Sequence, residues 1–335
     1  MKNAFLCVDT CVGVKSGDDV LIIADADHML PANALAAAAS ALGANPVVLD
    51  ATAQVTLAMA RPEEPELIKP PRHMAAAMKS SNVIFACTDS AYAGRLATSD
   101  DTHKEAIDAG AKYAAVESGM DKWCITPHDI QLIKERTGKI ALALTGHKWV
   151  KVTTDAGTDI KLSIEGRKPL VVMPVKDRSG PWGSGGPFTG PIPKWGEVTF
   201  GVVEETAEGK FVVDAYMVGI GLLGEPIEWV VKKGRVVEIR GGAEAYRLKR
   251  ILSKADVNAY CIAEIGVGTS HLEPTGTGKE ESGALGTLHL AIGDNSRVYP
   301  GGTIRSNIHL DALTRNMTVE VDGQVVCERG AWKVL

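Results

Sequence analysis

Five residues of the types that bind metal ions are spread along the second half of the chain. Each lies in a short apolar or glycine-rich segment: Glu197, Glu264, His289, His309 and Asp311. Imidazole and carboxylate groups are the ligands that Zn, Mn, Co and Fe(II) accept. A charged side chain in an apolar segment is costly to bury unless it is paired or bound to a metal ion. The five residues therefore predict one metal site that is assembled from four segments.

The pair His309 and Asp311 is the most informative part of this set. Residues two apart in a β-strand point to the same face, so both side chains can bind at one site. Such pairs also occur by chance on exposed strands, and an isolated histidine is more often a satisfied core or surface residue than a ligand. The prediction of a metal site therefore depends on the whole series of segments.

The composition is that of an ordinary globular protein. The chain has 335 residues, of which 45% are hydrophobic and 23% charged, and its net charge of −5 gives no basic surface for nucleic acid. It has no apolar run long enough to span a membrane and no convincing signal peptide. The 6 cysteines form no Cys-x-x-Cys pair, which is typical of reduced thiols. We expect a cytoplasmic protein that acts on a small molecule or short peptide, with no nucleic-acid or membrane partner.

Strand-like and helix-like segments alternate in the first half of the chain. Apolar runs predict strands at 19–25, 46–50, 83–87 and 112–116, and helical patterns predict helices at 31–42, 73–80, 102–109 and 127–137. Strands that are separated by helices of this length predict a parallel sheet. No Gly-x-Gly-x-x-Gly follows the first strand, so neither a dinucleotide site nor a phosphate-binding loop is expected.

The pattern changes between residues 146 and 157. Beyond this point, β-prone runs predict strands at 158–164, 198–203, 211–218, 229–231 and 235–239, with one helix at 243–253. We therefore expect an α/β domain with a parallel sheet over 1–150 and a β-rich α+β domain with the metal site over 151–335. The Gly- and Pro-rich segment 179–187 is interpreted either as a linker or as a flap that leads to Glu197.

Taken in order, these segments resemble the aminopeptidase T-like metallopeptidase family, and the resemblance covers nearly the whole chain. It is carried by Gly196-Glu197-Val198, by Glu264-Ile265-Gly266, by His289-Leu290-Ala291-Ile292-Gly293 and by Ser306-Asn307-x-His309-x-Asp311. The resemblance implies two divalent metal ions (Zn, Mn or Co) that are bound by the five predicted ligands, and it implies a homodimer.

Two departures from that family bear on the substrate. The family's peptidases place a tyrosine ligand seven residues after the first histidine, where this chain has Ser296, and Tyr299 is the candidate to replace it. The intervals from Glu264 to His289 and from His289 to His309 are shorter than in the peptidases. The walls of the pocket, and with them the substrate, are therefore expected to differ.

The same fold also resembles 2,5-dihydroxypyridine 5,6-dioxygenase, which holds one Fe(II) through two histidines and one aspartate. His309 and Asp311 correspond to the last two of those ligands, and Glu264 stands where the dioxygenase has its first histidine. The positions that match Glu197 and His289 carry no ligand in that enzyme. On this comparison, the chain keeps the two-metal set and lacks one histidine of the iron site.

Three carboxylates suit two divalent cations better than one Fe(II) with open positions. We therefore interpret the chain as a metal-dependent hydrolase of amide or peptide-like small substrates, with Glu197 or Glu264 assisting a metal-activated water. The alternatives are a non-haem Fe(II) ring-cleaving dioxygenase and a binding protein whose metal site is structural or vestigial. Arg305 is a candidate to orient a substrate carboxylate, with a plain surface arginine as the alternative.

Overall fold

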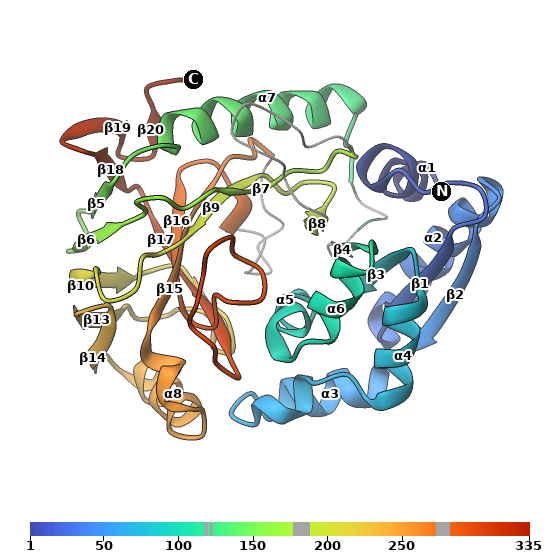
Figure 1. The fold of residues 1–335 in the computed structure, drawn as a ribbon, viewed down its shortest axis with the longest axis horizontal. Helices are drawn as coiled ribbons and strands as arrows, with labels where there is room; N and C mark the ends of the chain where they lie inside the picture. The colour runs from blue at the N-terminus through green and yellow to red at the C-terminus, as the bar shows by residue number, and fades with distance from the viewer. Residues whose placement is uncertain (117–119, 121–122, 177–187, 273–281) are drawn as a thin grey trace.

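The computed structural model describes residues 1–335 apart from 117–119, 121–122, 177–187 and 273–281. Its strands form three sheets, a parallel one in the N-terminal half and two antiparallel ones built from the rest of the chain (Figure 1). The expected combination of a parallel-sheet α/β part with a β-rich part is confirmed. The segment 179–187, interpreted as a linker or flap, lies outside the described residues.

The parallel sheet has the strand order β2-β1-β3-β4-β8. Its strands are β1 (Asp19–Ala24), β2 (Asn45–Asp50), β3 (Val83–Cys87), β4 (Lys112–Val116) and β8 (Phe188–Ile192). The helices of this half are α1 (Lys2–Phe5), α2 (Met29–Ala41), α3 (Thr52–Ala60), α4 (Arg72–Ser80), α5 (Ser90–Ser99), α6 (Thr102–Asp108) and α7 (Pro127–Leu144). The four predicted strands and four predicted helices are all present, because buried parallel strands are continuous apolar runs that the sequence displays directly.

Helices that the sequence did not predict complete this half. They include α1, the turns of π-helix that follow it over Leu6–Val12, α3 and α5. Helix α7 also continues past its predicted end at residue 137, through the buried Gly138. Packing offsets the low helix propensity of glycine there. Helix α5 lies against the strand that carries His309 and Asp311.

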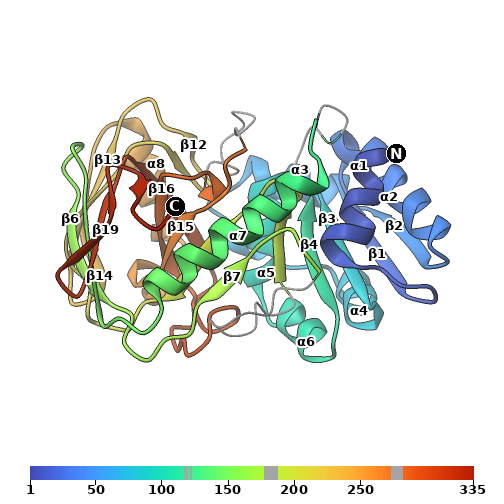
Figure 2. The same cartoon turned by 90° about the horizontal axis from the view of Figure 1, so that it is seen from above.

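The two antiparallel sheets pack face to face. The eight-stranded sheet consists of β14 (Arg235–Arg240), β13 (Ile227–Lys232), β10 (Glu208–Val213), β6 (Asp159–Ser163), β5 (Trp149–Thr153), β18 (Thr318–Val321), β19 (Gln324–Glu328) and β20 (Ala331–Trp332). The seven-stranded sheet consists of β12 (Gly221–Leu222), β11 (Tyr216–Met217), β17 (His309–Arg315), β16 (Thr287–Gly293), β15 (Ile262–Gly268), β9 (Glu197–Gly201) and β7 (Leu170–Val172). Between them lies an apolar core that includes Phe200, Val267 and Trp229. Helix α7 crosses the edge of this layered part (Figures 1 and 2), and α8 (Ala243–Ser253) lies at its lower end in the view of Figure 1.

Two features depart from the expected order of elements. The predicted strand at 211–218 is two strands, because the chain leaves the eight-stranded sheet after β10 and enters the seven-stranded sheet at β11. Strand β8, from beyond residue 150, pairs with β4 and extends the parallel sheet. The chain therefore returns to the first sheet after β7, and the domain boundary near residue 150 stays a prediction.

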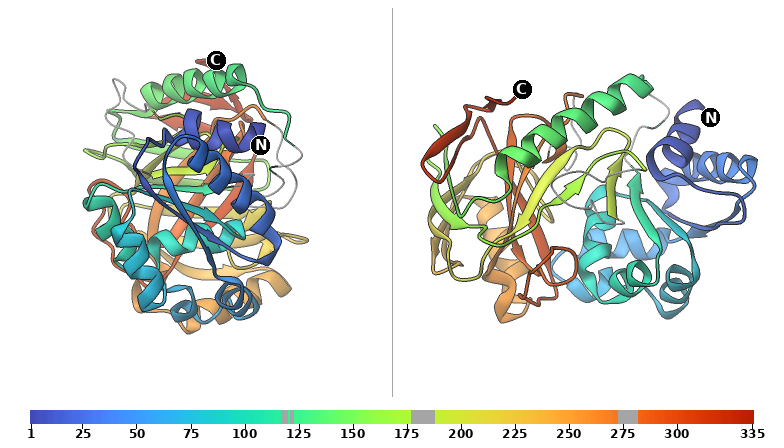
Figure 3. Two further views of the ribbon diagram at one scale, coloured as in Figure 1. Left: turned by 90° about the vertical axis from the view of Figure 1, so that its right-hand side faces the viewer. Right: turned by 45° about the horizontal axis from the view of Figure 1, so that its top comes forward.

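The second face of the seven-stranded sheet points toward the N-terminal half (Figure 3). A cavity between the two parts is lined by residues of α5 and β4 on one side and of β9, β15 and β17 on the other. Among the helices in the described ranges, none is both long and apolar enough to cross a membrane. The predicted ligands all lie on this second face.

Candidate metal centre

Four neighbouring strands of the seven-stranded sheet supply the five predicted ligands. Glu197 begins β9, Glu264 lies on β15, His289 lies on β16, and His309 and Asp311 lie on β17. These strands are adjacent in the order β17-β16-β15-β9. All five side chains are buried. The structure thus brings the predicted ligands together, while their role in binding a metal stays a prediction.

The strand register explains how five large side chains fit on one face of the sheet. Ala291 pairs with Glu264 on one side and with Asp311 on the other, so a methyl group separates the two carboxylates. Gly266 on β15 pairs with His289 on β16. A Cβ atom at Gly266 would lie 2.3 Å from two ring atoms of His289 and 2.8 Å from Glu197 Oε1. Small residues therefore alternate with the ligands and keep space open above the sheet.

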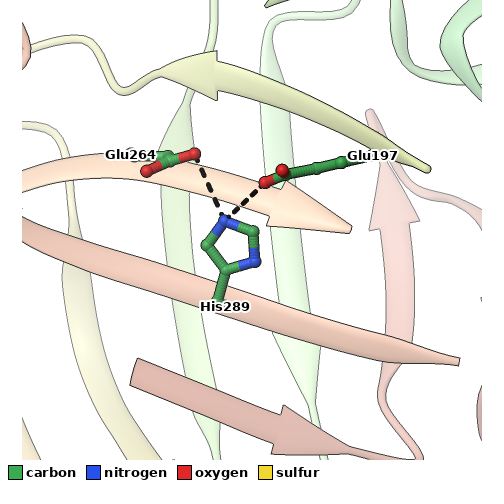
Figure 4. A group of neighbouring side chains, drawn as sticks. All are labelled: Glu197, Glu264 and His289. Carbon is green, nitrogen blue, oxygen red and sulfur yellow. Dashed lines mark hydrogen bonds and ion pairs between the residues drawn. The ribbon is translucent and has the colours of Figure 1, made fainter. Parts of the chain in front are cut away.

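The first group of ligands joins Glu197, Glu264 and His289 (Figure 4). His289 Nε2 lies 2.8 Å from Glu197 Oε1 and 3.2 Å from Glu264 Oε1. Trp195 Nε1 donates a hydrogen bond to Glu197 Oε2 at 2.8 Å, and Thr199 Oγ1 donates one to Glu264 Oε1. The other ring nitrogen of His289, Nδ1, is buried and has no hydrogen-bond partner among the described residues.

The second group joins Glu264, His309 and Asp311. His309 Nε2 lies 2.9 Å from Glu264 Oε2 and 3.1 Å from Asp311 Oδ1. His309 Nδ1 lies 2.7 Å from the carbonyl oxygen of Asp294, so it must donate to that oxygen. Tyr299, the candidate to replace a missing tyrosine ligand, is also here. Its hydroxyl donates to Glu264 Oε2 at 2.6 Å and lies 3.1 Å from His309 Nε2.

The charges of the cluster favour bound cations. Burial alone would raise the pKa of Glu264, but His289 and His309 lower it to about 2. Burial alone would lower the pKa of His309, but Asp311 and Glu264 raise it to about 10. Since His309 Nδ1 is already a donor, Nε2 can face two carboxylates only with a proton or a cation between them. The donor atoms of each group lie within 4.8 Å of one another, and their chemistry fits divalent metal ions.

The space above the cluster is small and has apolar walls. The cavity has a volume of about 60 Å³, and Ala93, Gly94 and Ala97 of α5 form part of its lining. Leu170, Trp195 and Val298 contribute further apolar surface. Such walls exclude water and strengthen electrostatic interactions inside the site.

Arg305, the candidate to orient a substrate carboxylate, does not line this cavity. Its side chain is 59% exposed and pairs with Asp101 at the surface. The alternative interpretation, a surface arginine, therefore describes its position.

Comparison with known proteins defines the class. The family model of NicX, described as 2,5-dihydroxypyridine 5,6-dioxygenase, matches residues 1–333. The chain therefore belongs to the 2,5-dihydroxypyridine 5,6-dioxygenase family. No curated protein sequence matches the chain.

Two solved structures share the fold over almost the whole chain. The 2,5-dihydroxypyridine dioxygenase from Pseudomonas putida KT2440 has a TM-score of 0.68 and 16% identity, covering 98% of this chain and 95% of its own. Wild-type AmpT from Thermus thermophilus has a TM-score of 0.69 and 17% identity, covering 99% of this chain and 98% of its own. At these identities, the two comparisons show a common fold.

Family membership supports the expected assignment in part. The residue series resembles aminopeptidase T, whereas the family that matches the chain is the dioxygenase family, and AmpT shares its fold. Together, the family and the clustered residues define a metal-dependent enzyme whose fold AmpT shares.

Proposed function

We propose that this enzyme is a hydrolase that uses two divalent metal ions to cleave an amide bond in a small substrate. One observation carries the proposal: Glu264 belongs to both ligand groups and presents one oxygen to each. Its Oε1 lies 3.2 Å from His289 Nε2, and its Oε2 lies 2.9 Å from His309 Nε2. A carboxylate in this position is suited to bridge two cations, as in two-metal hydrolytic sites.

In this proposal, Zn, Mn or Co ions occupy the two groups. Glu197 and His289 would hold one ion, His309 and Asp311 would hold the other, and Glu264 would serve both. When bound, the two ions would supply an acidified water and polarise the scissile carbonyl. The five predicted ligands include three carboxylates, and their negative charge suits two divalent cations.

The residues around the ions have separate tasks. Glu197 or Glu264 would assist the metal-activated water by accepting its proton. The indole of Trp195 holds the Glu197 carboxylate in position. The hydroxyl of Tyr299 lines the cavity beside Glu264, and it could exchange its hydrogen bond to Glu264 for one to a developing oxyanion.

The family match favours a second candidate, an Fe(II) ring-cleaving dioxygenase. Glu264, His309 and Asp311 would then hold one Fe(II), with Glu264 in place of a histidine. The geometry supports this candidate less well for two reasons. A face of one histidine and two carboxylates lacks the second histidine of the usual oxygenase triad. It also leaves Glu197 and His289 buried together without a task.

Metal content and substrate tests separate the candidates. The purified protein is analysed for Zn, Mn, Co and Fe per chain and is then assayed with a panel of dipeptides and N-acyl amino acids. In parallel, oxygen uptake is followed with 2,5-dihydroxypyridine after anaerobic loading with Fe(II). We expect two divalent ions per chain and amide cleavage without oxygen uptake. One Fe per chain with stoichiometric oxygen uptake would overturn the hydrolase, and a metal-free inactive protein would indicate a binding role.

A further inference from the structure

The loop that joins β16 to β17 contacts both the candidate metal centre and the N-terminal half. It spans residues 294–308 and faces α5 and α6 in Figure 1. Its Tyr299 contacts Glu264 and His309 through the hydroxyl. Its Asp294 accepts the Nδ1 proton of His309 at the backbone carbonyl oxygen, over 2.7 Å. The conformation of this loop therefore sets the orientation of the His309 ring.

The loop is held from the inside by one buried carboxylate. Asp294 is 1% exposed, and its side-chain oxygens accept hydrogen bonds from the backbone N–H groups of Ser296, Arg297 and Ser306. A carboxylate is costly to bury without a cation. Arg297 supplies that cation, because its Nη1 lies 2.5 Å from Asp294 Oδ2. The same Nη1 donates to the carbonyl oxygen of Ser306 at 2.8 Å, so Arg297 ties the start of the loop to its end.

The same guanidinium also reaches the N-terminal half. Its Nε donates to Asp101 Oδ1 at 3.1 Å, and Asp101 lies between α5 and α6. The side chain of Arg297 is 7% exposed, whereas that of Asp101 is 44% exposed and also pairs with the surface residue Arg305. Helix α5 forms part of the wall of the metal cavity. Arg297 therefore connects that wall to the carbonyl group that orients His309.

Three contacts in fixed directions suit an arginine better than a lysine. A guanidinium is planar and holds its five N–H donors at fixed angles, whereas an ammonium group is a compact charge on a flexible stem. Arg297 uses Nε for Asp101 and Nη1 for Asp294 and Ser306. Groups that orient a metal-binding histidine typically change metal affinity or activity by about tenfold to 100-fold when they are lost. Loss of Arg297 should therefore affect metal binding as well as the fold.

We propose that Arg297 is a positioning residue of the metal centre. It acts through Asp294 on the ring of His309, and Asp101 couples it to the wall of the cavity. This role rests on the proposed function of His309 as a metal ligand. It does not depend on the reaction, because His309 belongs to the site in both the hydrolase and the dioxygenase candidate.

Titration of the metal-free protein with Co(II), followed by the visible absorption of the bound ion, tests this role. The Kd of the more tightly held ion should rise by about tenfold to 100-fold in Arg297→Met. Arg297→Lys should give a smaller rise, because a lysine can pair with Asp294 without keeping all three contacts. Asp101→Asn should raise the Kd by about fivefold at most, the scale of a partly exposed ion pair. Arg305→Met, which removes the other partner of Asp101, should bind Co(II) like the wild type.

Two precautions separate positioning from a purely structural role. Arg297→Met leaves Asp294 buried without its cation, so the melting temperature should also fall. Binding is therefore measured at a temperature where circular dichroism shows each metal-free variant to be folded. If Arg297→Met does not fold, the combination with Asp294→Asn removes both charges of the pair and should weaken Co(II) binding in the same way.

Arg250→Met is the matched control for a lost ion pair between the two halves. Arg250 on α8 pairs with Glu63 of the N-terminal half at 3.2 Å, and neither residue belongs to the loop. This variant should keep the wild-type affinity for Co(II). An equal loss of affinity in Arg250→Met and Arg297→Met would assign Arg297 a structural role and overturn the proposal.

The outcome is distinguishable from that of the hydrolase assignment. If amides are not cleaved but Arg297→Met weakens Co(II) binding, the hydrolase fails and the positioning role stands. If amides are cleaved but the folded variant binds Co(II) like the wild type, the reverse holds. A wild-type protein that binds no Co(II) would overturn both. For any substrate that is turned over at saturating metal, Arg297→Met should lower kcat and leave KM nearly unchanged.

Discussion

The two halves of the candidate metal centre share Glu264 but differ in how their histidines are held. In the half with His309 and Asp311, both ring nitrogens of the histidine are used, one by the Asp294 carbonyl and one by the carboxylates. In the half with Glu197 and His289, the Nδ1 atom of the histidine has no partner in the described ranges. Metal-binding histidines usually donate their second N–H to an orienting group, which fixes the ring and strengthens the ligand.

This difference predicts unequal metal binding. The His309 half is preorganised, so it should bind its ion more tightly than the His289 half. The same half corresponds to the single iron site that the dioxygenase resemblance implies. The His289 half is therefore what distinguishes a two-metal hydrolase from a one-metal oxygenase, and changes to its residues should separate the two enzymes.

Glu264→Gln should have the largest effect, because this carboxylate serves both halves. We expect turnover to fall by about 10³-fold or more, since losing a ligand to both ions removes several kcal/mol of transition-state stabilisation. Metal content should fall below one ion per chain. Glu320→Gln, on β18 and outside the site, is the matched control. A Glu264→Gln protein that keeps two ions and most of its activity would contradict the bridging role.

A pair of histidine variants tests the asymmetry directly. His289→Ala should leave one ion per chain in the preorganised half and reduce turnover by about 10²-fold or more, because the hydrolase needs both ions. His309→Ala should release the tightly bound ion and weaken the other through Glu264. The number of metal ions per chain, measured after dialysis against buffer, tests both outcomes. Full activity of His289→Ala with one Fe per chain would favour the oxygenase.

The clustering of these five residues could be predicted from the sequence, because a charged residue in an apolar strand is seldom tolerated unless it is paired or bound to a metal ion. Glu264 lies among Ala263, Ile265 and Gly266, where a solvated face would require polar neighbours. The parallel strands were equally predictable from their continuous apolar runs. The strand at 211–218 was not, because its break depends on two sheets that meet only in the folded chain.

The residues that surround the ligands could not be found in this way. Trp195 lies two residues before Glu197, but nothing in the sequence shows that its indole returns to that carboxylate. Arg305 attracted attention because it lies near His309 in sequence, yet it pairs with Asp101 at the surface. Contacts between distant segments decide these roles.

Gly266→Ala should weaken the His289 half alone. The added methyl group would occupy the space beside the His289 ring and Glu197 Oε1, where it would lie 2.3 Å and 2.8 Å from them. We expect about one ion per chain and a loss of turnover of about tenfold to 100-fold, on the scale of other disturbances to ligand orientation. Gly224→Ala, whose added methyl would lie 3.5 Å from Glu244, is the control. Two tightly bound ions in Gly266→Ala would contradict this account of the glycine.

Removing the metal should have the smallest effect on the fold. The face of the seven-stranded sheet opposite the ligands packs on an extensive apolar core with Phe200, Leu290 and Leu310, and the parallel sheet has a second core around Tyr92 and Tyr113. These cores do not depend on the ligands, unlike those of small domains that fold only around zinc. During titration with a chelator, activity should be lost when the first ion leaves, at about one ion per chain. The far-UV circular dichroism spectrum should stay close to that of the loaded protein during and after the removal of both ions. Unfolding that coincides with metal loss would show that the centre is structural, and simultaneous loss of both ions would contradict the difference between its halves.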